Sequence, residues 1–438
     1  MKQSQVQRLT VVREFDRIIC DHKDYSQNHR GFHSFNQIEF DQLRKFILKD
    51  DSGDTQSFLT LSSSSNLGYV ITVRNYVGMI ELPTGHRIQI LPKIDMSAKA
   101  PQLNEEHILL QMIQYVSNPE TKVYQTANLR TAEIDIFEVF ISIYLKMIMR
   151  LVKEGLRSDY HKMSENLPAF KGKLLIKEQI KYNHSHKERF YVQHDEFSIN
   201  CPENRIVKAA LLLLSRVTRD YNNQKQILQL LPYFENVKDT HNPMVEFSKI
   251  TIGRTNLRYV DILNWSRVFL KNQSFTILAG KENANSLLFR MDNLYERFVA
   301  QRLKKLLQNQ HDHWKIQLQD QKYKLFDYPR PIFKLRPDIV AQHRGKVVIL
   351  DTKWKRLVNN FQKNYGISQA DMYQMYVYAK KYQTSEVYVL YPYVKGFNKD
   401  SFVFSSSDDV NIHICFLDLS QIDNSLSKII ETFDVTTA

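Results

Sequence analysis

The alternation of apolar and polar residues divides the chain into regions of different character. Between residues 69 and 94 apolar side chains recur at about every second position, which is typical of strands. Three short strands are predicted there: Tyr69–Val73, Val77–Leu82 and Arg87–Leu91, with Pro83-Thr84-Gly85 as the turn between the last two. Residues 66–100 therefore form a small β module. Residues 1–65 are mixed in pattern and end in a polar run, so they form an N-terminal extension whose role stays open.

Helical periodicity dominates the middle of the chain. Apolar residues spaced three and four apart predict helices at 105–117, 134–156 and Glu203–Arg219, and residues 224–280 are mostly helical as well. One strand pair interrupts them, with Leu174–Tyr182 opposite Arg189–Phe197. Residues 101–280 thus read as a mainly helical domain that carries a β-hairpin.

The last third of the chain contains both helical and strand-like spacing of apolar residues. A helix is expected at Ser286–Gln308 and another at Ser368–Tyr382. Strands are expected at Lys315–Leu318, Lys322–Phe326, Ile332–Ala341, Lys346–Lys353, Glu386–Tyr391, Ser401–Phe404 and Asn411–Phe416, before a closing helix. This order suits an α/β domain with a mixed central sheet at residues 281–438. The predicted fold class is therefore a multidomain α/β protein.

Composition agrees with a globular, multidomain chain. The 438 residues are 43% hydrophobic and 24% charged, which excludes a disordered or fibrous protein. Three widely spaced cysteines suit neither a zinc site nor a disulfide framework, so a cytoplasmic location is expected. The most apolar stretch, residues 134–152, contains Glu138, Lys146 and Arg150. It reads as a buried helix, and no membrane partner is expected.

Positive charge is concentrated in one short segment. The formal net charge is +13, and residues 321–363 carry 11 basic and 3 acidic side chains, a net of +8. Asp338 and Asp351 are two of those three acids. Carboxylates inside a basic stretch suggest a site that attracts phosphates and also holds metal ions. The alternative is a solvated, lysine-rich hairpin.

Two short motifs in this segment carry the candidate chemistry. Arg336-Pro337-Asp338 is followed, after an apolar run, by Asp351-Thr352-Lys353. Residues i and i+2 of a strand face the same side, so Asp351 and Lys353 project together. Asp338, from the preceding strand, is expected beside Asp351 across the hairpin.

The two carboxylates and the Thr352 carbonyl are hard oxygen ligands for Mg²⁺, or for Mn²⁺ in its place. The ammonium of Lys353 is suited to orient water and to offset charge on a phosphate, which points to metal-assisted phosphodiester hydrolysis. The alternative is a structural Asp–Lys pair beside an unrelated aspartate.

Two helices supply further candidates. Glu296, on helix 286–308, is a possible third carboxylate, and Gln374 and Tyr378 lie one turn apart on helix 368–382. Each has an ordinary alternative, a surface glutamate or an aromatic stripe in the core. Taken together in this order, the motifs resemble the PD-(D/E)XK nuclease superfamily, and Gln374 with Tyr378 is similar to the QxxxY motif of its RecB-like branch.

The superfamily resemblance implies a role for each candidate residue. Metal would be bound by Glu296, Asp338 and Asp351. Lys353 would be catalytic, and Gln374 and Tyr378 would support the site or contact DNA. Arg336, Lys355 and Arg356 are the candidates for contacts with nucleic acid, although a solvated strand end explains the last two equally well.

Segments outside the nuclease motifs narrow the resemblance. Residues 75–80, 88–94, 172–174 and 204–210 are similar to the McrC family, the nuclease subunits of McrBC modification-dependent restriction systems. The resemblance implies a partner, an McrB-like AAA+ GTPase that recognises methylated DNA, and an endonuclease activity in this chain. The chain has no GxxxxGK[ST] phosphate loop, so GTP would be bound only by that partner.

Other functions stay open at this point. The chain could be a nuclease of the same fold that acts alone or in a differently targeted restriction system. It could also be a non-catalytic activator of the AAA+ motor. The hairpin at residues 76–94 is a candidate contact with that motor, against the alternative of an ordinary edge of a small β structure.

Overall fold

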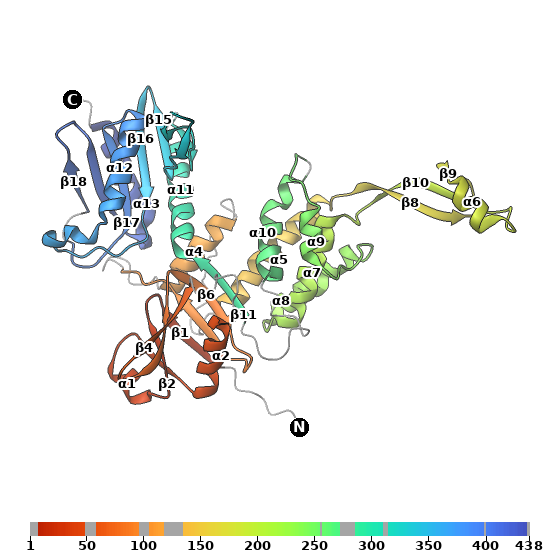
Figure 1. The fold of residues 1–438 in the computed structure, drawn as a ribbon, viewed down its shortest axis with the longest axis horizontal. Helices are drawn as coiled ribbons and strands as arrows, with labels where there is room; N and C mark the ends of the chain where they lie inside the picture. Colours follow the sequence, from red (N-terminus) through yellow and green to blue (C-terminus); the bar gives the residue numbers. More distant parts are fainter. Residues whose placement is uncertain are drawn as a thin grey trace. The chain divides into compact units, whose positions relative to one another are not determined.

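The structure is a computed structural model that describes residues 8–48, 58–95, 105–117, 135–254, 256–271, 285–309, 314–397 and 400–435. The chain forms two compact units (Figure 1). The first consists of residues 1–136 and 288–438, and the second of residues 137–287. The architecture is α/β with several mixed sheets, as the sequence predicts.

Two four-stranded sheets form the N-terminal module of the first unit. Their strand orders are β1-β7-β6-β11 and β3-β2-β5-β4. The strands are β1 (Leu9–Arg13), β2 (Arg17–Cys20), β3 (Phe32–Phe35), β4 (Leu59–Ser64), β5 (Gly68–Val73), β6 (Tyr76–Glu81), β7 (Arg87–Leu91) and β11 (Asn285–Arg290). The helices are α1 (Lys23–Asn28), α2 (Gln37–Leu48) and α4 (Glu105–Ser117). In α2 the buried Phe40, Leu43 and Ile47 follow helical spacing and give the helix one apolar face.

The predicted hairpin is confirmed. Strands β6 and β7 pair antiparallel, with Ile80 opposite Ile88, and Gly85 takes the positive φ that the turn needs. Strands from the first 65 residues complete both sheets, because β1 pairs with β7 and β2 pairs with β5. The sheets therefore run across the boundary that the pattern suggested at residue 65. A turn that includes Phe15, with φ of 66°, interrupts the alternation in this part of the chain and hides its strands.

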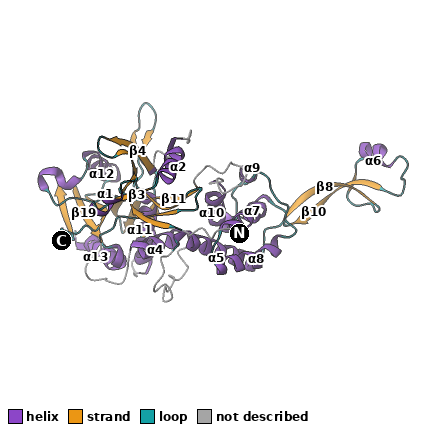
Figure 2. Ribbon diagram, turned by 90° about the horizontal axis from the view of Figure 1, so that it is seen from below, coloured by secondary structure: helices purple, strands orange, loops and turns teal. Residues whose placement is uncertain are grey.

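The second unit joins a group of helices to a long β arm. The helices are α5 (Ile136–Glu154), α7 (Pro202–Val217), α8 (Tyr221–Leu230), α9 (Pro243–Ser248) and α10 (Val260–Lys271), with short 3₁₀ turns at Leu231–Phe234 and Leu257–Tyr259. The arm consists of β8 (Asp159–Leu167), β9 (Lys173–Leu174), α6 (Ile176–Asn183) and β10 (Phe190–Ser198). Figure 2 shows β8 and β10 running side by side to α6.

The arm corrects one prediction. The sequence predicts a strand at Leu174–Tyr182, but most of this segment is helix α6, and β10 pairs along its length with the polar strand β8. The side chain of Gln179, within the helix, hydrogen-bonds to the backbone N–H of Tyr191 and the carbonyl of Arg189. Short apolar runs fit either period, so contacts with the opposite strand, which are invisible in a local pattern, decided the outcome.

A six-stranded mixed sheet forms the C-terminal part of the first unit. Its order is β12-β15-β16-β17-β19-β18, with β16, β17 and β19 parallel and the other pairings antiparallel. The strands are β12 (Lys315–Leu318), β15 (Ile339–His343), β16 (Lys346–Thr352), β17 (Glu386–Pro392), β18 (Ser401–Ser405) and β19 (Asn411–Leu417), and a small separate hairpin is formed by β13 (Lys324–Phe326) and β14 (Ile332–Lys334). The helices are α11 (Met291–Asn309), α12 (Gln369–Tyr382) and α13 (Ile422–Val435), with 3₁₀ turns at Phe361–Gly366 and Leu419–Gln421.

Helices cover both faces of this sheet. Met375 of α12 belongs to the same apolar cluster as Ile349 and Val389, on one face. Tyr388, which points to the opposite face, packs against Phe433 of α13. The central strands are therefore buried on both sides.

Two local differences from the expected elements matter for the site. The strand predicted at Ile332–Ala341 is two strands, β14 and β15, separated by residues 335–338. Pro337, in this gap, has no N–H to donate to a neighbouring strand. Residues 285–290 are strand β11, so α11 begins at Met291. Among the helices that the structure describes, none is long and apolar enough to cross a membrane.

Candidate functional site

The strand register brings the two motif aspartates together. Strands β15 and β16 pair antiparallel, with Ile339 opposite Leu350, so Asp338 lies beside Asp351 at the end of β16. Asp351 is 2% exposed and faces the α12 side of the sheet, like Ile349 two residues earlier. The predicted arrangement across the hairpin is confirmed.

Thr352 holds Asp338 in place. Its backbone N–H and its hydroxyl both donate to Oδ2 of Asp338, each at 2.7 Å. The sequence pointed to Thr352 through its carbonyl oxygen, and the role of its two donors was not foreseen. These bonds orient one carboxylate oxygen of Asp338 toward the strand end.

Lys353 completes the cluster, as the two-residue spacing predicts. Its Nζ lies 2.6 Å from Oδ2 of Asp351 and 3.3 Å from Oε1 of Gln374. Its backbone N–H donates to the carbonyl of Leu390 on β17 at 3.0 Å. The ammonium is therefore held between a buried carboxylate and the side chain of a helix.

Gln374 and Tyr378 lie on the same face of α12. Nε2 of Gln374 donates to the Tyr378 hydroxyl at 2.8 Å, which leaves its carbonyl oxygen facing Lys353. The ring of Tyr378 belongs to the apolar core, and burial raises its pKa to about 12. Tyr378 is thus both a core aromatic and the hydroxyl that orients Gln374. A helix N-cap, in which Ser368 accepts from the N–H of Asp371, fixes the start of α12.

The carboxylates of the cluster are crowded, and Asp351 is buried. Burial and the charge of Asp338 raise the pKa of Asp351 to about 7, and burial also raises the pKa of Asp338. Burial alone would lower the pKa of Lys353, but the charge and hydrogen bond of Asp351, together with the charges of Asp371 and Asp338, outweigh burial and raise the pKa. A pair of carboxylates that repel each other in a buried site favours a bound cation, because a cation relieves the repulsion.

Glu296 is close to this cluster but is held by another residue. Its Oε1 accepts a hydrogen bond from Nε2 of Gln319 at 2.5 Å. Burial and the charge of Asp338 raise the pKa of Glu296. Within the described ranges, no three histidine, cysteine, aspartate or glutamate side chains converge closely enough to form a metal-binding group. Glu296 is bonded to Gln319, so the candidate metal ligands that lie side by side are Asp338 and Asp351.

The three candidate nucleic-acid contacts have different surroundings. The exposed Arg336 donates to Oε1 of Gln319. Lys355 pairs with Asp371 at 2.6 Å, and Arg356 pairs with Asp95 at 2.6 Å. Lys355 and Arg356 are thus partly neutralised within the chain, and a phosphate would have to compete with a carboxylate for each.

Several residues around the site carry no sequence signal. Gln319 connects Glu296 with Arg336, and its N–H donates to the carbonyl of Asp338 at 2.8 Å. It directly follows β12, a strand that the sequence predicts with the same bounds, but its positive φ of 48° is invisible in the sequence. Trp354 likewise belongs to no sequence motif. It directly follows Lys353, and only its contacts reveal that it is held on both sides.

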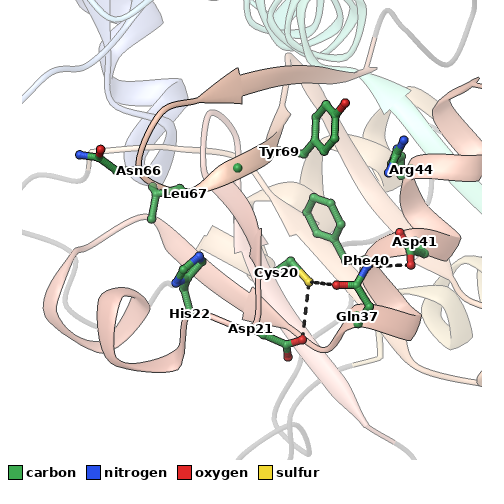
Figure 3. A pocket seen from close by; sticks show the side chains of 11 residues that line it. Cys20, Asp21, His22, Gln37, Phe40, Asp41, Arg44, Asn66, Leu67 and Tyr69 are labelled. Atoms are coloured by element: carbon green, nitrogen blue, oxygen red, sulfur yellow. Dashed lines mark hydrogen bonds between the residues drawn. The ribbon is translucent and has the colours of Figure 1, made fainter.

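A separate pocket lies in the N-terminal module, lined by residues that include Cys20, Gln37 and Asp41 (Figure 3). The Cys20 thiol donates to Gln37 at 3.0 Å, and Gln37 donates to Asp41 at 2.8 Å. Burial and the nearby Asp21 raise the pKa of the thiol, which keeps it protonated and poorly nucleophilic. None of the candidate nuclease residues lines this pocket.

Comparison with known proteins agrees with the resemblance in the motifs. None of the curated proteins matches the chain. A solved structure described as a refined half-complex from the tetradecameric assembly of Thermococcus gammatolerans McrB AAA+ hexamers with bound McrC is similar over 97% of this chain and 99% of that chain, at 18% identity and a TM-score of 0.64. The cryo-EM structure of the Thermococcus gammatolerans McrBC complex is similar over 68% of this chain and 88% of that chain, at 20% identity and a TM-score of 0.47.

At such identities the first likeness is one of fold. A family comparison is more specific, because the McrBC 5-methylcytosine restriction system component family matches residues 71–392, more than half of the chain. That range contains β6 and β7, all of the second unit, and the strands and helix around Asp338, Asp351, Lys353 and Gln374. The chain therefore belongs to the family of McrBC 5-methylcytosine restriction system components.

Proposed function

We propose that this chain is the nuclease subunit of a modification-dependent restriction system and hydrolyses DNA phosphodiester bonds. The observation that carries the proposal is the cluster of Asp338, Asp351 and Lys353 at adjoining strand ends, with Gln374 of α12 facing the ammonium. Two neighbouring carboxylates and a lysine in this order are the components of a PD-(D/E)XK site. Membership of a restriction-system family supports the same reading.

In this proposal the carboxylates of Asp338 and Asp351 bind Mg²⁺ or Mn²⁺, together with the Thr352 carbonyl and a released Glu296. The cation, when bound, offsets phosphate charge and acidifies a water molecule. Thr352 fixes the Asp338 carboxylate with its two donors. Lys353 is kept charged beside Asp351, where it holds and orients the attacking water, and Gln374 keeps the ammonium from turning away.

The DNA path would follow the basic segment 321–363. Arg336 directly precedes the site, and Lys355 and Arg356 follow it. A phosphate reaching Lys355 would displace Asp371, and one reaching Arg356 would displace Asp95. Contacts of this kind position the duplex without reading its sequence.

The partner in this proposal is an McrB-like AAA+ GTPase. The similar Thermococcus gammatolerans assembly is described as McrB AAA+ hexamers with bound McrC. Because this chain has no phosphate-loop motif, GTP would be hydrolysed by the partner, which would also select methylated DNA. The β6–β7 hairpin within residues 76–94 remains the candidate contact with it.

The test mixes the purified chain with its McrB-like partner, GTP, Mg²⁺ and methylated plasmid, and follows both DNA cleavage and GTP hydrolysis. Wild type is compared with Asp338→Ala and with Asp327→Ala, which removes the third acid of the same basic segment, exposed and outside the cluster. We expect cleavage by wild type and Asp327→Ala, none by Asp338→Ala, and equal stimulation of GTP hydrolysis by all three. Equal cleavage by all three would refute the assigned site. Stimulated GTP hydrolysis without cleavage by any of them would favour a non-catalytic activator, and cleavage without the partner would favour a nuclease that acts alone.

A further inference from the structure

We propose that the N-terminal module positions the candidate catalytic lysine, with Glu14 as the positioning residue and Trp354 as the side chain through which it acts. The inference rests on the proposed nuclease function and assigns a task to the first 65 residues. It follows from the contacts of a buried carboxylate that belongs to no sequence motif.

Glu14 lies directly after β1 and is fully buried. Both of its carboxylate oxygens lie 3.1 Å from Nε1 of Trp354, which donates to them, and one also accepts from the backbone N–H of Lys93 at 3.1 Å. Glu14 and Trp354 are 340 positions apart in the chain. The bond therefore joins the N-terminal module to the residue that directly follows Lys353.

Trp354 in turn contacts the helix that carries Glu296. Its ring packs against Tyr295, with centroids 5.2 Å apart. The Tyr295 hydroxyl donates to the carbonyl of Leu390 at 3.3 Å, and the same carbonyl accepts from the N–H of Lys353 at 3.0 Å. Glu14 thus holds Trp354, which follows Lys353 in the chain and packs against Tyr295, the residue before Glu296.

A second contact holds the same segment a little further on. Asp95 follows β7, the parallel neighbour of β1, so it leaves the same end of the sheet as Glu14. Its Oδ2 lies 2.6 Å from the guanidinium of Arg356 and accepts from the N–H of Lys395 at 3.1 Å. The module therefore holds both Trp354 and Arg356.

The held segment has no regular secondary structure and depends on side-chain contacts, which also include the buried Leu357. Strand β16 ends at Thr352, and residues 353–358 belong to no helix or strand. Their described backbone bonds include those from the N–H groups of Lys353, Lys355 and Val358, so side-chain contacts must supply much of the order. Catalytic groups need positions accurate to a fraction of an ångström, and a displacement of about 1 Å can cost about 100-fold in rate.

The burial of a carboxyl group at position 14 supports a positioning role for Glu14 over a role in core packing. Burial raises its pKa to about 7, so the site carries a carboxyl group at a cost that an apolar side chain would avoid. Unfavourable local choices of this kind are expected where function requires a particular geometry.

The test uses the full chain with its partner and compares five variants. Glu14→Ala removes the acceptor, Glu14→Gln keeps one oxygen for the tryptophan, and Trp354→Phe keeps an aromatic ring, smaller than the indole, without an N–H. The double variant Glu14→Ala/Trp354→Phe tests whether both act through one bond. Glu39→Gln is the matched control, since Glu39 is also buried in the N-terminal module but bonds to His86.

Three quantities are measured for each variant: the cleavage rate against Mg²⁺ concentration, the stimulation of GTP hydrolysis, and the melting temperature. The fluorescence of Trp354 is followed in a background where Trp265 and Trp314 are phenylalanine. We expect Glu14→Ala and Trp354→Phe to slow cleavage about 10-fold or more and to raise the Mg²⁺ requirement, with GTP stimulation unchanged. Glu14→Gln should recover most of the rate, the double variant should be no slower than either single variant, and Trp354 emission should shift to the red in Glu14→Ala alone.

Cleavage at the wild-type rate by Glu14→Ala, with Trp354 emission shifted, would overturn the proposal, because the bond would be lost without consequence. An equal loss of cleavage in Glu39→Gln would also overturn it, since the effect would then be general destabilisation. Additive losses in the double variant would show that the two residues act separately and would be a third contradiction. Failure of the underlying nuclease function looks different, because wild type itself would then stimulate GTP hydrolysis and cut no DNA.

Discussion

Thr352 donates two hydrogen bonds to a single oxygen of Asp338, one from its backbone N–H and one from its hydroxyl. The pair joins the last residue of β16 to the residue that precedes β15. Asp338 lies outside both strands, and this threonine fixes its side chain at the point where the candidate chemistry begins. Hydrogen bonds to a charged acceptor are stronger than neutral ones, so this contact is worth testing by itself.

Thr352→Val should weaken the site without removing a candidate ligand. The valine keeps the shape of the threonine and the backbone bond, and only the hydroxyl donor is lost. We expect the Mg²⁺ concentration for half-maximal cleavage to rise about 10-fold, in line with about 1.5 kcal/mol for a bond to a charged group. Thr432→Val is the control, because its hydroxyl bonds elsewhere, to Tyr388 and Ile429. An unchanged Mg²⁺ dependence in Thr352→Val would show that the backbone bond alone positions Asp338.

Lys353→Met should abolish cleavage and leave the fold intact. The methionine keeps much of the apolar stem and removes the charge that lies 2.6 Å from Asp351. We expect a loss of at least about 100-fold in the single-turnover cleavage rate, with GTP stimulation retained. Lys324→Met, in the same basic segment but on the β13–β14 hairpin, serves as the comparison. A residual rate within a few fold of wild type would assign Lys353 to an ordinary ion pair.

Substitutions of Gln374 and Tyr378 should differ in their effects on DNA cleavage and on stability. Tyr378→Phe keeps the ring in the core and loses only the hydroxyl that Gln374 contacts, so we expect a change of a few fold in cleavage and about 1 kcal/mol in unfolding free energy. Gln374→Ala removes the oxygen that faces the Lys353 ammonium and should slow cleavage more than Tyr378→Phe does. The two rates and the two melting curves decide the matter, and a larger loss of cleavage in Tyr378→Phe would reverse these roles.

Protein stability should depend on pH through Glu14. Burial raises its pKa to about 7 in the folded chain, against 4.5 for an ordinary glutamate. The folded state then holds the proton more tightly than the unfolded state, so this stabilisation is present below about pH 4.5 and is lost as the pH rises through 7. Glutamine does not titrate, and Lys93 and Asp292, which also act on Glu14, are unchanged in Glu14→Gln.

Urea unfolding of wild type and Glu14→Gln at pH 5, 6, 7 and 8 measures this effect. Relative to the glutamine variant, wild type should lose unfolding free energy on the order of 3 kcal/mol across the titration. A difference between the two proteins that stays constant from pH 5 to pH 8 would contradict the raised pKa.

Replacing Gly172 by alanine should disturb the β arm of the second unit. This residue has φ of 75°, and an added Cβ would lie 2.4 Å from the carbonyl oxygen of Gln193 on β10. Gly172→Ala should therefore loosen the pairing of β9 with β10 and speed amide hydrogen exchange there. Gly155→Ala is a close control, because its φ is 90° but nothing lies within 4 Å of the added atom, so only the backbone cost of about 1–2 kcal/mol applies. Equal exchange rates on β10 in both variants would exclude the predicted clash.

The strongly periodic elements could be predicted from the sequence, and so could the motif residues. Helices α5, α7 and α12 lie where the pattern indicates, because each buries one face at a regular spacing, and α4 and the β6–β7 hairpin also lie where they are predicted. The proximity of Asp351 and Lys353 follows from the two-residue period of a strand alone. Helix α6 was missed, because an apolar run of a few residues fits either period until its partner is known.

The sequence by itself determined which residue types carry the candidate chemistry and which family they resemble, because those are properties of order and spacing. Only the tertiary structure decided that Glu296 is held by Gln319, that Lys355 and Arg356 are paired with Asp371 and Asp95, and that Glu14 bonds to Trp354. The physical reason is distance along the chain. Each of these contacts joins segments at least 16 residues apart, and the Glu14 bond spans 340, so no local period records them.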